Sequence, residues 1–245
     1  MFGRIILVGT AISASAAAGF VVARREWRTW GVDADEAARA LPGDDLVADA
    51  TAVETRGIDL DAPPEAVWPW LVQMGYGRAG WYSYDAIDMD QASSRVISPE
   101  IATPEVGEVM PTHPGGGFVI KAIEPTQALV LYMDREIASR QATEHPLDPA
   151  SQNVRATGRF MDAAASGDFA ASWSFVLEPT GSGGTRLIER ARARMETPQG
   201  AAALLRPMLG FGVFVMMRRQ LLGIRDRVRS ARPFEGGPQA ALAAS

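Results

Sequence analysis

The chain has 245 residues, of which 47% are hydrophobic and 22% are charged, the profile of a globular protein with one sizeable domain. Its net charge of −5 argues against nucleic-acid binding, which needs a basic surface. The sequence has no cysteine, which excludes disulfides and thiolate metal sites, and its two histidines are too few for a histidine-rich metal site. We therefore expect neither a metal nor a cofactor.

An uncharged stretch near the amino terminus, residues 5–23, is just long enough as a helix to span the hydrocarbon core of a membrane. This predicts a single-pass anchor over residues 1–30, and a membrane as a partner. A cleaved signal peptide, with a small-x-small site at 14–16, and a soluble helix are the open alternatives. Three arginines within 24–28 follow the span, so the positive-inside bias places the globular part on the cytoplasmic side of the cell membrane.

The first part of the chain after this segment reads as a connector, then a strand, then two helices. Residues 31–50 are acidic and alanine-rich, which indicates a short helix and a turn that link the anchor to a domain over 51–230. Residues 52–60 alternate as a strand. The sequence "DAPPE" then predicts a helix start, with Pro69 inside the helix, and a second short helix is expected over 81–89.

The rest of the domain is predicted to be strands closed by a long helix. Residues 135–167 are polar and lack periodicity, which predicts a mobile insertion, and residues 231–245 are expected to form a disordered tail. Strands without alternating helices indicate an antiparallel sheet in an α+β protein, with one amphipathic helix over one face. The expected strands are 107–110, 117–124, 128–134, 168–179 and 184–196, and the helix runs from Thr197 to about Ser230.

This order, with "APPEAVWPWLVQMGYGRAGWYSYD" after the first strand and the closing "GTRLIER" and "MMRRQLLGIRDR", resembles the SRPBCC superfamily (START-like, Bet v 1-like) over about residues 50–230. The tryptophan-rich stretch resembles an uncharacterised membrane-anchored bacterial branch. The resemblance implies a helix-grip fold, in which a curved sheet encloses an apolar cavity around the long helix. It implies no shared catalytic residues, and a fold of this kind does not fix function.

The aromatic stretch provides the first candidate binding residues. Trp70 fits the apolar face of a helix and is expected in the core, whereas Trp81, Tyr82 and Tyr84 flank the short helices that the resemblance places at a mouth of the cavity. Arg78 could grip an anionic ligand, but we favour a pairing with Asp85 or Asp88 that holds the loop. Asp85 is an acid/base candidate, although a cap or surface role is the simpler interpretation.

The long strands and the last helix provide the remaining candidates. Trp173 and Phe175 share a face of their strand, and on the next strand Glu189 and Ala191 oppose a row of arginines. Either Glu189 points inward, or a bulge brings Arg190 inward, and both alternatives place a charge in an apolar interior. The last helix is read as cavity-lining rather than as a second membrane span. Its candidate lining residues are Met208, Phe211 and Val215.

These observations favour a membrane-anchored domain that binds a small hydrophobic or amphipathic molecule, such as a lipid, in an internal cavity. A cyclase- or dehydratase-type enzyme acting on a cavity-bound substrate is the first alternative. A protein-interaction module at the membrane, using the sheet edge and residues 135–167, is the second.

Overall fold

The computed structural model describes residues 26–145, 168–195 and 202–231, and all statements below concern these residues. The helices are α2 (Ala34–Ala38), the 3-10 helix η1 (Asp45–Val47), α3 (Pro64–Val72), α4 (Asp85–Asp88), α5 (Arg135–Glu144) and α7 (Ala202–Ser230). The strands are β1 (Ala52–Leu60), β2 (Val109–His113), β3 (Gly116–Glu124), β4 (Ala128–Asp134), β5 (Phe169–Pro179) and β6 (Thr185–Met195).

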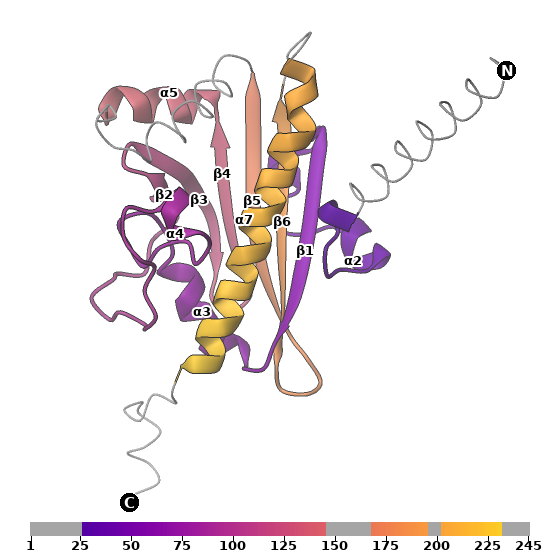
Figure 1. The fold of residues 1–245 in the computed structure, drawn as a ribbon, viewed down its shortest axis with the longest axis vertical. Coiled ribbons are helices and arrows are strands. Elements are labelled where there is room, and N and C mark those ends of the chain that lie inside the picture. The colour runs from indigo at the N-terminus through magenta and orange to yellow at the C-terminus, as the bar shows by residue number, and fades with distance from the viewer. Residues whose placement is uncertain (1–25, 146–167, 196–201, 232–245) are drawn as a thin grey trace, which may run out of the picture.

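The strands form one six-stranded antiparallel sheet in the order β1-β6-β5-β4-β3-β2 (Figure 1). Strand β1 therefore pairs with the last strand rather than with β2, and the sheet is open between β1 and β2. The β5–β6 hairpin lies at the lower end in Figure 1, and the carboxyl end of α7 lies near it. We use "lower" and "upper" in this sense.

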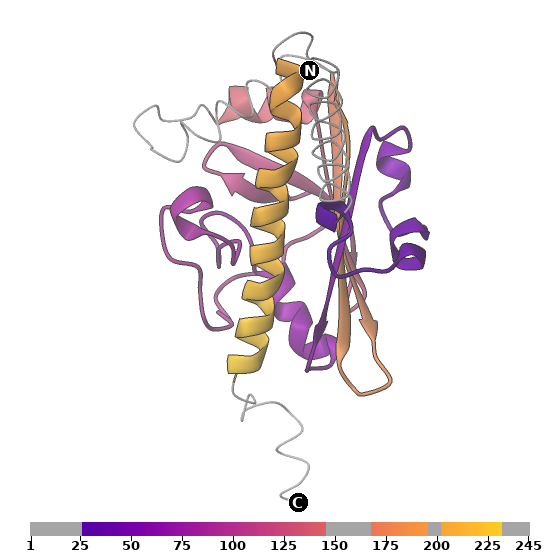
Figure 2. The same ribbon diagram turned by 45° about the vertical axis from the view of Figure 1, so that its right-hand side comes forward.

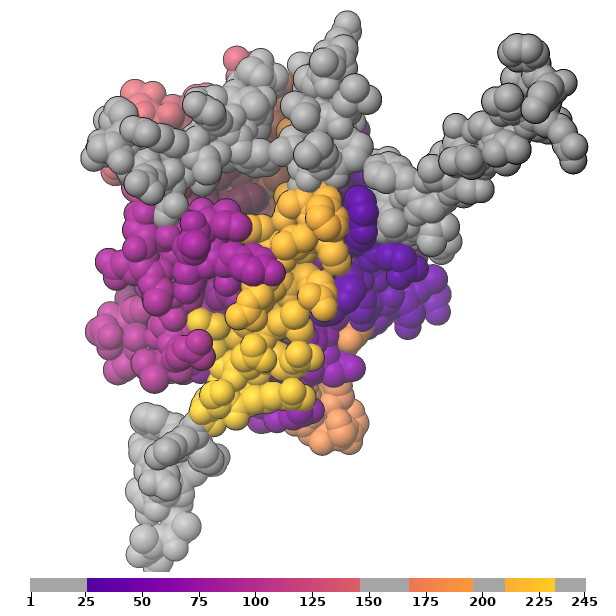
Figure 3. Space-filling view, viewed as in Figure 1, coloured from indigo at the N-terminus to yellow at the C-terminus, as the bar shows by residue number. Residues whose placement is uncertain are grey.

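The domain has three layers. Helix α7 crosses one face of the sheet, here called the inner face, and residues 31–50 lie on the other, outer face (Figure 2). In the space-filling view α7 is open to the surface along one side, between β1 and the loops around α4 (Figure 3). The α+β, helix-grip architecture expected from the sequence is thus confirmed.

The lower half of α7 packs closely on the segment before α4. A Cβ atom on Gly223 would lie 2.0 Å from the carbonyl oxygen of Tyr82, so only glycine allows this approach. Leu221 and Ile224 of the same helix are buried in a continuous apolar core with Trp70 and Leu71 of α3. The lower half of the inner face is therefore filled with packed side chains.

Two predicted elements differ from the structure. The expected helix over 81–89 is reduced to the four residues of α4, because Tyr82 adopts a left-handed φ of 60° and its backbone N–H donates to Ser93 Oγ instead of to a helical carbonyl. The expected insertion over 135–167 begins with α5. Asp134 caps this helix by accepting from the N–H of Ile137, and the rest of the insertion, 146–167, lies outside the described residues.

The predicted connector is a packed part of the domain. Residues 31–50, which we call the strap, contribute the buried side chains of Leu41 and Val47 to the outer face. Leu41 forms a small apolar cluster with Val176 of β5 and Ile188 of β6. The strap therefore covers the outer face instead of spacing the domain from the preceding segment.

The predicted anchor lies almost wholly outside the described residues, which begin at residue 26. Among the helices that the structure describes, none is long and apolar enough to cross a membrane. Membrane attachment through residues 1–30 therefore stays a prediction from the sequence, and so does the cytoplasmic placement. The predicted start of the last helix at Thr197 and the predicted tail also lie outside the described residues.

Candidate functional site

Burial changes along the inner face of the sheet. In the lower half Leu177 and Leu187 are buried under α3 and α7, and Phe175, at the level of Glu189, is buried where the two halves meet. In the upper half the inward side chains of Trp173 and Ala191, which are direct neighbours on β5 and β6, are only partly buried. Among the described residues, the upper half of the inner face is thus less completely covered than the lower half.

Aromatic rings form one wall of this region. The ring of Trp173 stacks on Trp81, with 5.1 Å between centroids and 15° between planes, and meets the edge of Phe118 at 5.7 Å. Phe175 lies below it, at 5.1 Å. Trp81 is fixed by a 3.1 Å hydrogen bond from Nε1 to the carbonyl of Pro111. The structure therefore brings together three predicted site residues, and adds Phe118, which the sequence did not single out.

A fully buried carboxyl group lies beside these rings. Glu189 is 0% exposed on the inner face, and its Oε1 accepts a 2.8 Å hydrogen bond from Trp173 Nε1. Its other oxygen, Oε2, has no hydrogen-bond partner among the described residues. Burial raises the pKa of Glu189 to about 8, against the opposing effects of nearby Arg56 and of the Trp173 bond. Glu189 is therefore the ionisable residue that points inward, which was one of the two alternatives left open by the strand alternation.

The residue opposite Glu189 on β1 is Arg56, which sequence reasoning missed. Its guanidinium is also 0% exposed, donates to the carboxylate of Glu54, and lies 2.7 Å from Met217 Sδ and 5.4 Å from the centre of the Phe214 ring. Arg56 Nε has no hydrogen-bond partner within the part of the chain that the structure describes. The signal was present in the sequence, because Arg56 shares its strand face with Ile58 and Leu60.

Tyr82 holds the backbone and does not face a ligand. It is 1% exposed, and its hydroxyl donates to the carbonyl of Trp70 at 3.1 Å and accepts from Gln73 Nε2 at 2.8 Å. The guanidinium of Arg227 lies 4.2 Å from the ring centre. Burial raises the pKa of Tyr82 to about 12, so the phenol stays neutral. Tyr84, by contrast, is 42% exposed.

The predicted acid/base residue, Asp85, fastens a loop. Its carboxylate accepts from the backbone N–H of Ser93 at 3.0 Å and from the Ser93 hydroxyl. Burial and the neighbouring Asp85 raise the pKa of Asp88 to about 6. Within the described ranges no group of three or more acidic or histidine side chains is placed to hold a metal ion.

The predicted pairing of Arg78 with Asp85 or Asp88 is wrong. The Arg78 guanidinium donates instead to three backbone carbonyls, those of Val72, Met74 and Ala102, at 2.8–3.0 Å. Val72 is the last residue of α3 and Met74 follows it closely, in the region where helix carbonyls lack internal partners. Arg78 therefore ties the end of α3 to the loop before β2.

Arg190 does not reach the interior, because no bulge re-phases β6 and the residue points to the outer face. It is 2% exposed under the strap. The guanidinium donates to Thr55 Oγ1, to the carboxylate of Asp44, and to the carbonyls of Glu36, Ala37 and Arg39, at 2.7–3.0 Å. Its role is to fix the strap, not to bind a ligand in the interior.

The predicted cavity-lining residues of α7 differ in their exposure. Phe211 is 45% exposed and contacts the ring of Trp27 at 4.9 Å, while Val215 is partly buried. The side chain of Met208 lies outside the described part. The link from α7 to the interior is instead Phe214, between Phe211 and Arg56.

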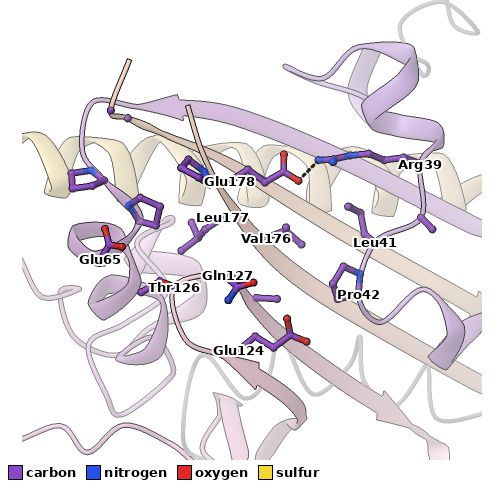
Figure 4. A pocket seen from close by; sticks show the side chains of 17 residues that line it. Arg39, Leu41, Pro42, Glu65, Glu124, Thr126, Gln127, Val176, Leu177 and Glu178 are labelled. Carbon is purple, nitrogen blue, oxygen red and sulfur yellow. Dashed lines mark ion pairs between the residues drawn. The ribbon is translucent and has the colours of Figure 1, made fainter. Parts of the chain in front are cut away.

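A pocket of about 730 Å³ lies on the outer face at the lower end, between the strap, the β3–β4 turn and the start of α3 (Figure 4). Leu41 and Val176 provide apolar surface, and Arg39 pairs with Glu178 across 2.7 Å. None of the predicted site residues lines it. The half-exposed ion pair contributes little to stability, and no buried polar group points to a ligand there.

The sequence matches no protein-family model and no curated protein. Solved structures with some likeness include a protein of Mesorhizobium loti (17% identity, 74% of this chain and 100% of that one, TM-score 0.37) and a conserved protein of Geobacillus kaustophilus (14%, 73% and 95%, 0.37). Another is Ara h 8.0201 (11%, 74% and 99%, 0.27). At these TM-scores the fold assignment rests on the strand order and the position of α7, not on the likenesses.

Proposed function

We propose that the chain binds a small hydrophobic or amphipathic molecule between the upper half of the inner face and α7. The observation that carries the proposal is the buried Glu189 carboxyl, with one oxygen unpartnered, directly beside the partly exposed ring of Trp173. An apolar wall with one or two convergent polar groups is the usual composition of a small-molecule site. A membrane lipid fits this description if residues 1–30 anchor the chain.

The aromatic wall would supply most of the affinity. Removing apolar surface from water contributes about 25 cal/mol per Å², and Trp173, Phe118 and the small side chain of Ala191 offer such surface without blocking access. The small size of Ala191 matters because it is paired directly with Trp173 across β5 and β6. A large side chain at this position would compete with a ligand for contact with the Trp173 side chain.

A neutral fluorescent probe, N-phenyl-1-naphthylamine, tests the proposal with the full-length protein. Wild-type protein should bind the probe with a saturable rise in emission, and Ala191→Phe should weaken binding at least about tenfold. Ala142→Phe, which adds the same ring at an exposed position of α5, is the matched control and should bind like the wild type. Equal affinity in all three proteins would contradict the proposed location.

An enzyme acting on a bound substrate is the second candidate, and Glu189 is also the observation in its favour. A carboxyl with a pKa of about 8 can give or take a proton near neutral pH. Tyr82 and Asp85 are poorly placed for acid/base catalysis, because both side chains are engaged in holding the backbone. A cyclase- or dehydratase-type activity would therefore depend on Glu189, and turnover should disappear in Glu189→Gln while binding persists.

A further inference from the structure

Among the described residues, two buried polar atoms on neighbouring strands lack hydrogen-bond partners. Glu189 Oε2 and Arg56 Nε belong to side chains that are both 0% exposed, and the two residues are cross-strand neighbours on β6 and β1. A buried polar group without a partner costs the protein stability that a hydrogen bond would restore. Two such atoms on the same face of adjacent strands point to one ligand group that bonds to both.

Both atoms are hydrogen-bond donors at neutral pH. Glu189 Oε1 already accepts from Trp173 Nε1, so the proton of the neutral carboxyl belongs on Oε2. The carboxyl is mostly neutral at pH 7 because burial raises its pKa to about 8. Arg56 Nε always carries its hydrogen. The ligand atom that meets them must therefore be an acceptor.

The charge balance of the interior selects among acceptors. The guanidinium of Arg56 is already neutralised by Glu54, whose carboxylate it contacts. With Glu189 neutral, these three residues carry no net charge. A carboxylate or phosphate ligand would add an uncompensated buried negative charge, which is costly, whereas a ketone, ester or amide would not.

We propose that the polar end of the ligand is an uncharged carbonyl group, which accepts hydrogen bonds from Glu189 Oε2 and Arg56 Nε. This inference rests on the proposed function and specifies the class of molecule that the site takes. The groups that face the Glu189 carboxyl are Arg56 and Glu54 from β1, Trp173 and Phe175 from β5, and Met217 and Phe214 of α7 through Arg56. Of these, only Arg56 and Glu54 are charged.

Three naphthalene probes that differ in one substituent test the inference by equilibrium dialysis with the full-length protein. They are 2-acetylnaphthalene, a neutral ketone; 2-ethylnaphthalene, its apolar counterpart; and 2-naphthoate, a carboxylate. At about pH 7 the wild type should bind the ketone about tenfold more tightly than the ethyl compound, and naphthoate most weakly. At about pH 9.5 the ketone preference should disappear, because Oε2 has lost its proton.

Two variants separate hydrogen bonding from structural damage. Glu189→Leu should bind the ketone and the ethyl compound with equal affinity, because it has lost the donor that distinguishes them. Glu189→Gln retains an N–H donor that does not titrate, so it should keep the ketone preference at both pH values. This rescue across pH is a result that a merely structural role of Glu189 would not produce.

The outcomes distinguish the two proposals. If no probe binds to the wild type, the proposed function fails and the carbonyl inference fails with it. If the ketone and ethyl compounds bind equally, and Glu189→Leu changes nothing, the carbonyl inference is overturned while the proposed binding function stands. Tightest binding of naphthoate would also overturn the inference, because it would show that the interior accepts a negative charge.

Discussion

Glu189 is a carboxyl group taken fully out of water, and its ionisation should affect stability as well as binding. Its pKa is about 8 in the folded protein and near the ordinary value of 4.5 in the unfolded chain. The folded state therefore holds the proton more tightly. The resulting stability is fully present below about pH 4.5 and is lost as the pH rises toward and through 8.

The Glu189→Gln variant removes this titration without changing the shape of the side chain. Between about pH 5 and 8, the free energy of unfolding of the wild type should fall relative to Glu189→Gln by up to about 1.4 kcal/mol per pH unit, and the difference should level off above pH 8. Urea unfolding of both proteins at several pH values measures it. Glu178→Gln, on the outer face, is the control; parallel stability profiles for wild type and Glu189→Gln would contradict the burial of an ionisable group.

At the level of elements, the strap is the part whose role the structure changes most. It is held against β6 by a row of arginines, and the charges of Arg186, Arg190 and Arg194 are each matched by an acidic side chain of the strap. Only Arg190 is buried, at 2% exposure. Four of its five acceptors belong to the strap, so it is the residue on which the position of the strap depends.

Substituting Arg190 should loosen the strap. Arg190→Met removes the guanidinium that donates to three carbonyls of the strap, and it leaves Asp44 with only the Leu41 N–H and Arg192. It should lower the free energy of unfolding by about 3 kcal/mol and speed hydrogen exchange over residues 31–50. Arg194→Met is the matched control, because its ion pairs are largely exposed and should contribute much less to stability. Similar losses in the two variants would show that Arg190 does not hold the strap.

Local patterns were sufficient to predict the long elements of the sheet. The strands over 52–60 and 128–134 have the predicted bounds, and alternation placed Trp173 and Phe175 on one face while leaving either Glu189 or Arg190 to point inward. The sequence could not show where Arg78 and Arg190 find partners, because those partners are mainly backbone carbonyls, which no residue type identifies, and the carbonyls that Arg190 meets belong to a distant segment. The inward direction of Arg56 was missed, although alternation puts it on the same face as Ile58 and Leu60. Its position opposite Glu189 depends on the strand register, which the sequence does not show.

At the level of the whole molecule, the two ends of the inner face have different roles. The lower half is a continuous core that joins the sheet, α3 and α7, and Gly223 lets α7 approach closely. The upper half combines partly exposed rings with buried polar atoms that have no partner. This division explains how one sheet can be stable and still offer a binding surface.

The most direct test of binding is native mass spectrometry of the full-length protein as purified, followed by organic extraction of what accompanies it. The account predicts a stoichiometric small molecule that is lost in Ala191→Phe but retained in Ala142→Phe. Extraction should yield a neutral molecule with a carbonyl group. A wild-type protein with the mass of the bare chain, which also binds no added neutral probe, would contradict the claim that the inner face is a binding site.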